Sequence, residues 1–216
     1  DTMNMNCLPC QRRKNMNYSE CIENARTRIG NYCKACPECN GRACKNQMPG
    51  PGAKGVGDTA IRNYDKWKEI RVNIDTLTEN IPVSTSIKIF DKTFNLPIFA
   101  GPIGAVNLHY GNKYNDTEYN DILVTAAAKA GIAAFTGDGI DPNVMESATT
   151  VIKKNNGCGV PTVKPWNDKI IKEKFEMIKD CGSFAVAMDI DAAGLPFLKN
   201  LTPKAGTKSI EELSNI

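Results

Sequence analysis

The sequence predicts an α/β fold in which helices cover a parallel sheet. Short apolar runs that end at Gly, Pro or polar residues alternate with segments of helical pattern from residue 96 onward. Strands that alternate with helices at this spacing form either a barrel or a doubly wound sheet. If the fold is an eight-unit (β/α)8 barrel, the four units found here are its first half.

The N-terminal residues do not follow this pattern and are predicted to form a Cys-rich segment, residues 1–50. Seven of the nine cysteines lie in the first 44 residues. A short helix is predicted over 19–29, because Ser19 is placed as an N-cap before a stripe of apolar residues.

The stretch "MPGPGAKGVG", residues 48–57, carries four glycines and two prolines. Because this composition excludes regular structure, it marks the start of the main domain, residues 51–216. The strands predicted in that domain are 96–102, 132–137, 159–165 and 184–190. The helices are 119–131, which Gly131 ends, 142–154, 168–181, and a short one with Ser209 and Glu212 as a capping box.

Composition narrows the class of protein. The chain has 41% hydrophobic and 24% charged residues, typical of a globular protein, and its net charge of +3 is scattered rather than gathered into a basic stripe. We therefore expect neither a nucleic-acid nor a membrane partner. No apolar run reaches the ~20 residues of a membrane span, and no signal peptide is recognisable, so a cytoplasmic location is expected.

Small and polar residues follow the predicted strands at the end where parallel sheets bind ligands. The small residues of "AGPIGA" (100–105) would let the backbone approach a flat ring, although Gly and Pro also simply make turns. Lys164 offers a positive charge to an anionic ligand. Asp189 and Asp191 alternate on one strand, so both point the same way and suit hydrogen bonding or proton transfer. A salt bridge between Lys164 and one of these aspartates is the structural alternative.

The blocks from "GVGDTAIRNYDKWKEIRVNID" to "LPIFAGPIGA" resemble the opening of the FMN-dependent α-hydroxy acid oxidase and dehydrogenase family, the group of lactate oxidase and glycolate oxidase. The resemblance rests on their order: a Gly-x-Gly-Asp turn, an Asn-bearing helix, an Arg-x-x-x-Asp stretch, a "VSTSI" segment and a hairpin around "FDKTFNLP". It continues through "AAAKAGIAAFTGDG" and "MDIDAAGLPFL", and so covers roughly residues 55–216.

The resemblance implies a TIM barrel that binds FMN at its strand ends and oxidises a small 2-hydroxy acid. Carried over position by position, the cofactor-site residues are Pro102, Ile103, Gly104, Thr136, Thr162, Lys164 and Asp189. The first three would lie against the flavin ring, and Thr136 would reach its pyrimidine edge. Thr162 and Lys164 stand where the family usually has Gln and Tyr, and Asp189 stands where it usually has Thr.

Several family residues have no counterpart. The tyrosine that touches the substrate carboxylate is missing from "MPGPGAKGVGD", and the family's lysine, histidine, arginine and phosphate loops belong to the second half of its barrel. His109, the only histidine, is interpreted as an incidental loop residue. We therefore expect the chain to need the C-terminal half of a barrel, to be inactive with FMN alone, and to form a homo-oligomer as the family often does.

The cysteines Cys33, Cys36, Cys39 and Cys44 supply enough thiolates for a tetrahedral zinc site or an iron–sulfur cluster. Zinc would staple a segment too small to form its own core, whereas an iron–sulfur cluster would exchange electrons with the flavin. Reduced thiols packed as small apolar groups are the third interpretation. Two other functions also stay open: a related barrel such as type 2 isopentenyl diphosphate isomerase or IMP dehydrogenase, and a non-catalytic metal- or flavin-binding module.

Overall fold

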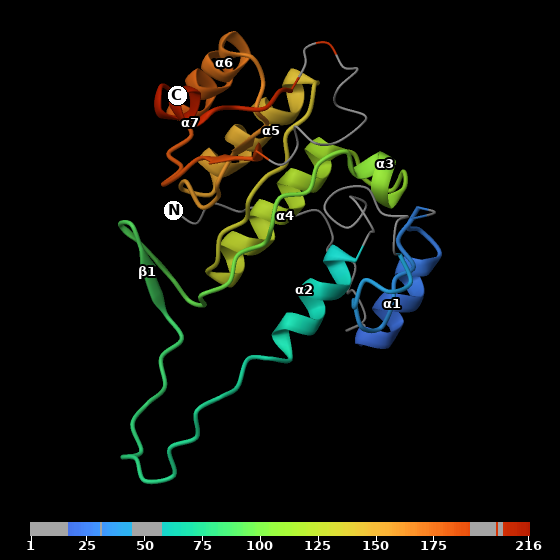
Figure 1. The fold of residues 1–216 in the computed structure, drawn as a ribbon, viewed down its shortest axis with the longest axis vertical. Coiled ribbons are helices and arrows are strands. Elements are labelled where there is room, and N and C mark those ends of the chain that lie inside the picture. Colours follow the sequence, from blue (N-terminus) through green and yellow to red (C-terminus); the bar gives the residue numbers. More distant parts are fainter. Residues whose placement is uncertain (1–16, 31, 45–57, 191–201, 203–204) are drawn as a thin grey trace, which may run out of the picture.

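The structure is a computed structural model that describes residues 17–30, 32–44, 58–190, 202 and 205–216. In these ranges, helices pack beside short strand segments, as the α/β prediction requires (Figure 1). The predicted domain boundary at 48–57 and the second aspartate, Asp191, lie outside the described residues.

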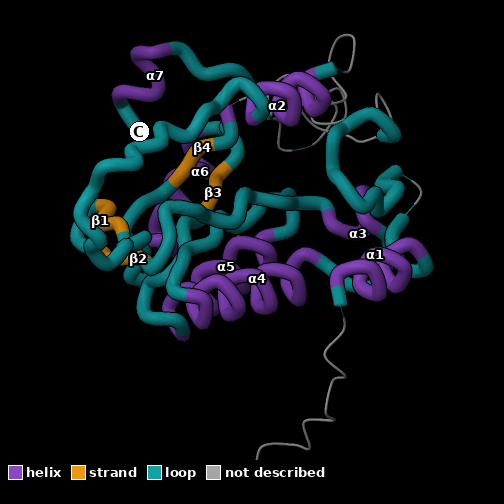
Figure 2. Tube along the Cα trace, turned by 90° about the horizontal axis from the view of Figure 1, so that it is seen from below, coloured by secondary structure: helices purple, strands orange, loops and turns teal. Residues whose placement is uncertain are grey.

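Four extended segments pair in parallel, in chain order. The paired residues are Ala100 with Ala134, Phe135 with Val160, Thr162 with Ala187 and Val163 with Met188. Only the last two segments are strands, β3 (Thr162–Val163) and β4 (Ala187–Met188), which lie side by side in Figure 2. The first segment ends early because Pro102 has no N–H to continue the ladder. The described segments therefore form a parallel array of four βα units with shorter strands than the sequence predicts.

The helices begin and end at local capping signals. They are α1 (Tyr18–Arg26), α2 (Thr59–Trp67), α3 (Val106–Tyr110), α4 (Asp116–Ala130), α5 (Pro142–Lys154), α6 (Asp168–Lys179) and α7 (Ile210–Ser214). The predictions for α5, for the Gly131 cap of α4 and for the Ser209–Glu212 capping box are confirmed. The prediction that Ser19 is the N-cap of α1 is wrong. The N-cap is Asn17, two residues before Ser19, and it forms a capping box with Glu20.

A β-hairpin closes the amino-terminal end of the parallel array. Strands β1 (Ile87–Ile89) and β2 (Lys92–Phe94) pair antiparallel, which confirms the hairpin expected around "FDKTFNLP". Phe94 is buried, and its ring centroid lies 4.9 Å from that of Phe99 and 5.4 Å from that of Phe184. Because Phe99 and Phe184 come just before the paired residues of their segments, the opposite, carboxyl end is left for a ligand.

Two core clusters pack the helices on one face of the array. Ala134 packs with Val124 and Ile152 of α4 and α5, while Val163 packs with Met145, Trp166 and other residues around α5 and α6. We call this the helix-covered face of the array and the opposite side the inner face. No described helix has the length and apolar character needed to span a bilayer.

The Cys-rich segment is packed against the main domain. The Gly30 N–H donates to the Tyr110 carbonyl of α3 over 2.8 Å. Gly41, with φ of 74°, lies so close to Ala60 of α2 that a Cβ would come within 2.7 Å of its backbone. Arg42 forms an exposed ion pair of 3.3 Å with Asp65. Residues 17–44 therefore lie beside the first two helices of the main domain.

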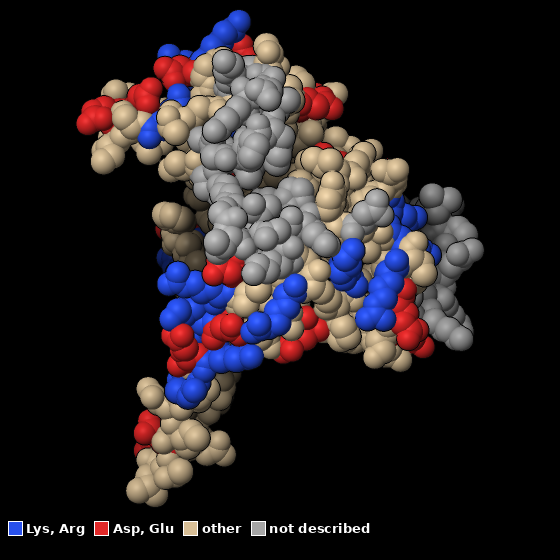
Figure 3. All heavy atoms as spheres, turned by 45° about the vertical axis from the view of Figure 1, so that its right-hand side comes forward, with Lys and Arg blue, Asp and Glu red and all other residues tan. Residues whose placement is uncertain are grey.

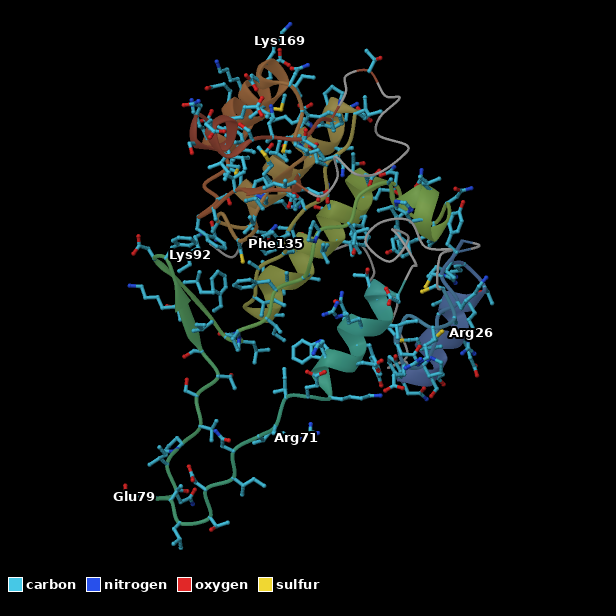
Figure 4. All side chains as sticks on the ribbon, in the orientation of Figure 1. Arg26, Arg71, Glu79, Lys92, Phe135 and Lys169 are labelled. Carbon is cyan, nitrogen blue, oxygen red and sulfur yellow. The ribbon has the colours of Figure 1, made fainter. Side chains whose placement is uncertain are left out.

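An extended arm follows α2 and projects from the rest of the molecule, as the positions of Arg71 and Glu79 show in Figure 4. Its apolar side chains are exposed; Leu77, for example, is 99% exposed. On the face drawn in Figure 3, acidic and basic residues are interspersed, in agreement with the scattered charge of the sequence.

Candidate functional site

Residues at the strand ends lie either on the helix-covered face or on the inner face of the array. The alternation of side chains along each strand decides the face on which a residue lies. Val163 and Met188 pack into the core around α5 and α6, so they lie on the helix-covered face. Successive side chains of a strand point to opposite faces. The neighbouring residues Thr162, Lys164 and Asp189 therefore share the inner face, and the structure brings these three predicted residues together.

Thr136 belongs to the other face. It comes two residues after Ala134, which packs against α4 and α5, so alternation places Thr136 on the helix-covered face. Its side chain is fully buried, and within the part of the chain that the structure describes its hydroxyl oxygen has no hydrogen-bond partner. Thr136 and Thr162 therefore lie on opposite faces of the array, and their contacts with FMN stay a prediction.

The hydroxyl of Thr162 is the buried polar group that best marks a binding site. The residue is 4% exposed, and its Oγ1 has no hydrogen-bond partner among the described residues. A buried hydroxyl without a partner costs free energy, roughly 1–3 kcal/mol. A ligand with a polar edge at the inner face would remove that cost.

The loop "AGPIGA" after the first segment supplies an open surface. A Cβ added to Gly101 would meet no atom of the described residues within 4 Å apart from its chain neighbours, and Pro102 is exposed. At the other end of the loop, a Cβ on Gly104 would lie 3.0 Å from the Asp138 carbonyl oxygen, and one on Gly137 would overlap the Ile103 carbonyl oxygen. Ile103 and Gly104 are thus fixed against the second unit, while Gly101 and Pro102 face free space.

Lys164 and Asp189 form the salt bridge that the sequence left as an alternative. The Lys164 Nζ and Asp189 Oδ2 atoms lie 3.1 Å apart, and the two side chains are 16% and 30% exposed. Lys164 extends from β3 and Asp189 from β4, one residue beyond the pair Val163–Met188. An ammonium and a carboxylate are therefore fixed side by side at the carboxyl end of the array.

Sequence reasoning missed Asp138, which organises this end of the array. Its carboxylate accepts four hydrogen bonds. The donors are Lys174 Nζ at 2.6 Å, Trp166 Nε1 at 2.7 Å, Lys164 N–H at 2.8 Å and its neighbour Gly139 N–H at 2.9 Å. A buried carboxylate with so many donors is fully satisfied and fixes the groups around it. The only sequence signal was an Asp between two glycines after a strand, which carries no information about partners 26 to 36 residues away.

His109 lies on α3, close to the site. Burial lowers the pKa of its imidazole below the usual value, Asp116 opposes that shift, and Lys164 adds to it. The Asp116 carboxylate also accepts a 3.2 Å hydrogen bond from the Val106 N–H at the start of α3. The prediction that His109 lies in a loop is wrong, because it lies on the short helix α3 as a half-buried imidazole near Lys164.

The predicted metal site is not supported. Among the described residues, no three His, Cys, Asp or Glu side chains are arranged to hold a metal ion, and Cys33, Cys36, Cys39 and Cys44 are free thiols. Contacts with the neighbouring helices hold the loop instead. Tyr18 donates to the Pro37 carbonyl over 2.7 Å, Arg26 donates to the Ala35 carbonyl over 3.3 Å, and Tyr64 donates to Glu38.

The four cysteines still influence one another. Burial raises the pKa of the Cys44 thiol, and the nearby Cys39, Cys33 and Cys36 raise it further. Burial and three of these cysteines also raise the pKa of Tyr110 on α3. The thiols therefore occupy one neighbourhood beside α3 without the geometry of a metal site.

A separate pocket lies outside the strand ends. It is mostly apolar and lies between α5 and α6, with Met145, Trp166 and Met177 among its lining residues. Because Met145 and Trp166 belong to the core on the helix-covered face, this pocket does not join the inner face where Thr162 and Lys164 lie.

Comparison with known proteins gives one family. Residues 50–202 match the family described as FMN-dependent dehydrogenase. No curated protein matches the chain significantly. Among solved structures, the monotopic membrane protein (S)-mandelate dehydrogenase is similar at 16% sequence identity and a TM-score of 0.46, over 60% of this chain and 32% of that one. The chain thus spans about a third of the length of that protein.

Proposed function

Because the chain belongs to the FMN-dependent dehydrogenase family, we propose that it binds FMN at the carboxyl ends of its strand segments and serves the oxidation of a small 2-hydroxy acid. The four parallel segments would then be half of a (β/α)8 barrel, closed by four further units. FMN would accept the hydride that leaves the hydroxyl-bearing carbon of the substrate.

The observation that carries this proposal is the hydroxyl of Thr162. It is buried on the inner face and has no hydrogen-bond partner among the described residues. The loop after the first segment, separated from Thr162 by the second segment, has Gly101 and Pro102 facing open space. A flavin has a flat ring with a polar edge of carbonyl and nitrogen groups. The open loop would accept the flat surface, and Thr162 would donate a hydrogen bond to the edge.

The other residues of the inner face have roles that follow from their charge. Lys164 would place its ammonium group at the inner face, where it can stabilise anionic groups of the bound ligand. Gly137 and Gly104 would keep the loop against the second unit, which holds Ile103 in a fixed place. These residues bind and orient, and the base that takes the substrate proton would come from the complementary half of the barrel.

FMN binding tests this proposal. Titration of the purified chain with FMN should quench flavin fluorescence and shift the absorption bands, and Thr162→Val should weaken binding by about tenfold. Thr93→Val is the matched control, because Thr93 is an exposed threonine on β2. If Thr162→Val binds FMN as tightly as the parent chain, or if the parent chain does not bind FMN, the assignment of this site is wrong.

A second readout concerns turnover. We propose that this chain with added FMN does not oxidise lactate or glycolate, because binding and orienting groups alone do not supply a base. Steady reduction of FMN by either acid under anaerobic conditions would contradict this part of the proposal.

A further inference from the structure

The two members of the ion pair at the inner face are suited to bind two adjacent groups of a ligand. The Lys164 ammonium and the Asp189 carboxylate lie 3.1 Å apart and are both partly exposed. A lysine ammonium has three N–H donors, so it can bind an anion while it keeps its bond to Asp189. An ionised Asp only accepts hydrogen bonds, so it suits a hydroxyl group of the ligand.

The position of Lys164 depends on Asp138 rather than on the strand ladder. β3 ends at Val163, and the next residue after Lys164 is Pro165, which has no N–H to give. The Lys164 N–H donates instead to Asp138 Oδ2 over 2.8 Å, and the same oxygen accepts from Trp166. The carboxylate of Asp138 therefore fixes the main chain from which the Lys164 side chain reaches the inner face.

We propose that Lys164 and Asp189 together bind the 2-hydroxy carboxylate group of the substrate, and that Asp138 is the positioning residue for Lys164. The ammonium binds the carboxylate of the ligand, and Asp189 accepts a hydrogen bond from the adjacent hydroxyl. This inference rests on the proposed function and adds the substrate contacts. It also predicts a selectivity for acids with a hydroxyl next to the carboxylate, since other acids offer Asp189 no hydroxyl to bind.

Acetylation of lysine tests this inference without turnover. The chain is treated with sulfo-NHS-acetate, and the acetylation rates of Lys164 and Lys169 are followed by mass spectrometry. Glycolate should slow acetylation of Lys164 and leave Lys169 unchanged, because the Lys169 side chain is 85% exposed on α6. Acetate, which lacks the hydroxyl, should need a concentration about tenfold higher for the same protection.

Two variants separate the roles of the residues. Asp189→Ala should reduce the difference between glycolate and acetate, because the side chain that accepts the hydrogen bond from the hydroxyl is gone. Asp138→Asn should speed acetylation of Lys164 and weaken protection by glycolate, while Asp121→Asn, an exposed carboxylate on α4, should change neither. If Asp138→Asn does not fold, the comparison of glycolate with acetate on the parent chain still decides whether the pair binds this ligand.

Each outcome has a defined meaning. Equal protection by glycolate and acetate, or no protection of Lys164, overturns the inference. FMN binding is measured by fluorescence on the same samples, with glycolate present and absent. Protection without FMN binding supports the ligand contacts and contradicts the proposed cofactor, whereas FMN binding without protection contradicts the ligand contacts alone.

Discussion

Asp138 and Lys174 form a buried ion pair in which 2.6 Å separate the carboxylate Oδ1 from the ammonium nitrogen. Their side chains are 0% and 8% exposed. Asp138 follows the second strand segment and Lys174 lies on α6, so the pair joins the second and third βα units. A buried charge is costly unless it is paired and hydrogen-bonded, and here three further donors complete the shell of the carboxylate.

Replacement of Asp138 by Asn should destabilise the protein strongly. The amide would present N–H donors to the donors of Lys174, Lys164 or Trp166, and the Lys174 ammonium would lose its partner. Loss of one member of a buried ion pair costs about 3–5 kcal/mol. Urea unfolding followed by circular dichroism measures this free energy. Asp121→Asn on the surface of α4 should stay within about 0.5 kcal/mol of the parent, and a similarly small effect of Asp138→Asn would contradict a structural role of the pair.

The contact between the first two units predicts a difference between two glycines. Gly137→Ala would place its Cβ onto the Ile103 carbonyl oxygen, so the loop must shift. Overpacking of this kind typically costs about 1–3 kcal/mol. Gly101→Ala meets open space and should have little effect on stability, although it should weaken FMN binding if the flavin lies there. Thermal unfolding and FMN titration of both variants measure the two effects, and equal melting temperatures would show that the loop is not held against the second unit.

The helices α4, α5, α6 and α7 could be predicted because their ends are local signals, whereas α3 was not predicted and the N-cap of α1 was placed two residues too late. Gly131 takes the left-handed conformation that ends α4, and Ser209 with Glu212 starts α7. The strands were predicted at the right places in the sequence, but the predicted strands are too long. The length of a strand depends on pairing partners that lie far away in the sequence. Ala100 and Ala134, for example, form only an isolated bridge before the chain turns.

The candidate site could be predicted only in part. The residues Thr162, Lys164 and Asp189 share a face because Val163 of β3 pairs with Met188 of β4. This register cannot be predicted from the sequence. Thr136 was assigned to the same ligand through the family resemblance, whereas alternation from Ala134 places it on the helix-covered face. Asp138 could not be found from its neighbours in sequence, since its partners Lys164, Trp166 and Lys174 come from the loop after β3 and from α6.

The hairpin at the amino-terminal end should contribute much of its stability through Phe94. Its ring is 3% exposed and packs on Phe99 and Phe184. Phe94→Ala should therefore cost about 3–5 kcal/mol, as large-to-small changes in aromatic cores do. Phe90→Ala, at the 69% exposed tip of the same hairpin, should cost much less. Chemical unfolding of the two variants tests this, and comparable losses would mean that the hairpin does not close the array.

The single histidine allows a direct test of the environment of α3. Burial lowers the pKa of His109 below 6.5, and Asp116 and Lys164 act in opposite directions on it. Proton NMR of the imidazole C2–H gives one titration curve, since the chain has one histidine. We expect its midpoint below 6.5. Lys164→Met should move the midpoint upward and Asp116→Asn should move it downward, and a midpoint at or above the usual value would contradict the burial of His109.

The same shift predicts how stability depends on pH. The unfolded chain protonates His109 at its ordinary pKa, whereas the folded chain protonates it only at lower pH. Between these two values the unfolded state binds more protons, so stability rises with pH and is lost as pH falls from about 6.5 toward the folded pKa. His109→Gln should remove this contribution. The difference in unfolding free energy between the parent and His109→Gln should therefore change between pH 7 and pH 5, and a constant difference would show that the folded protein does not depress this pKa.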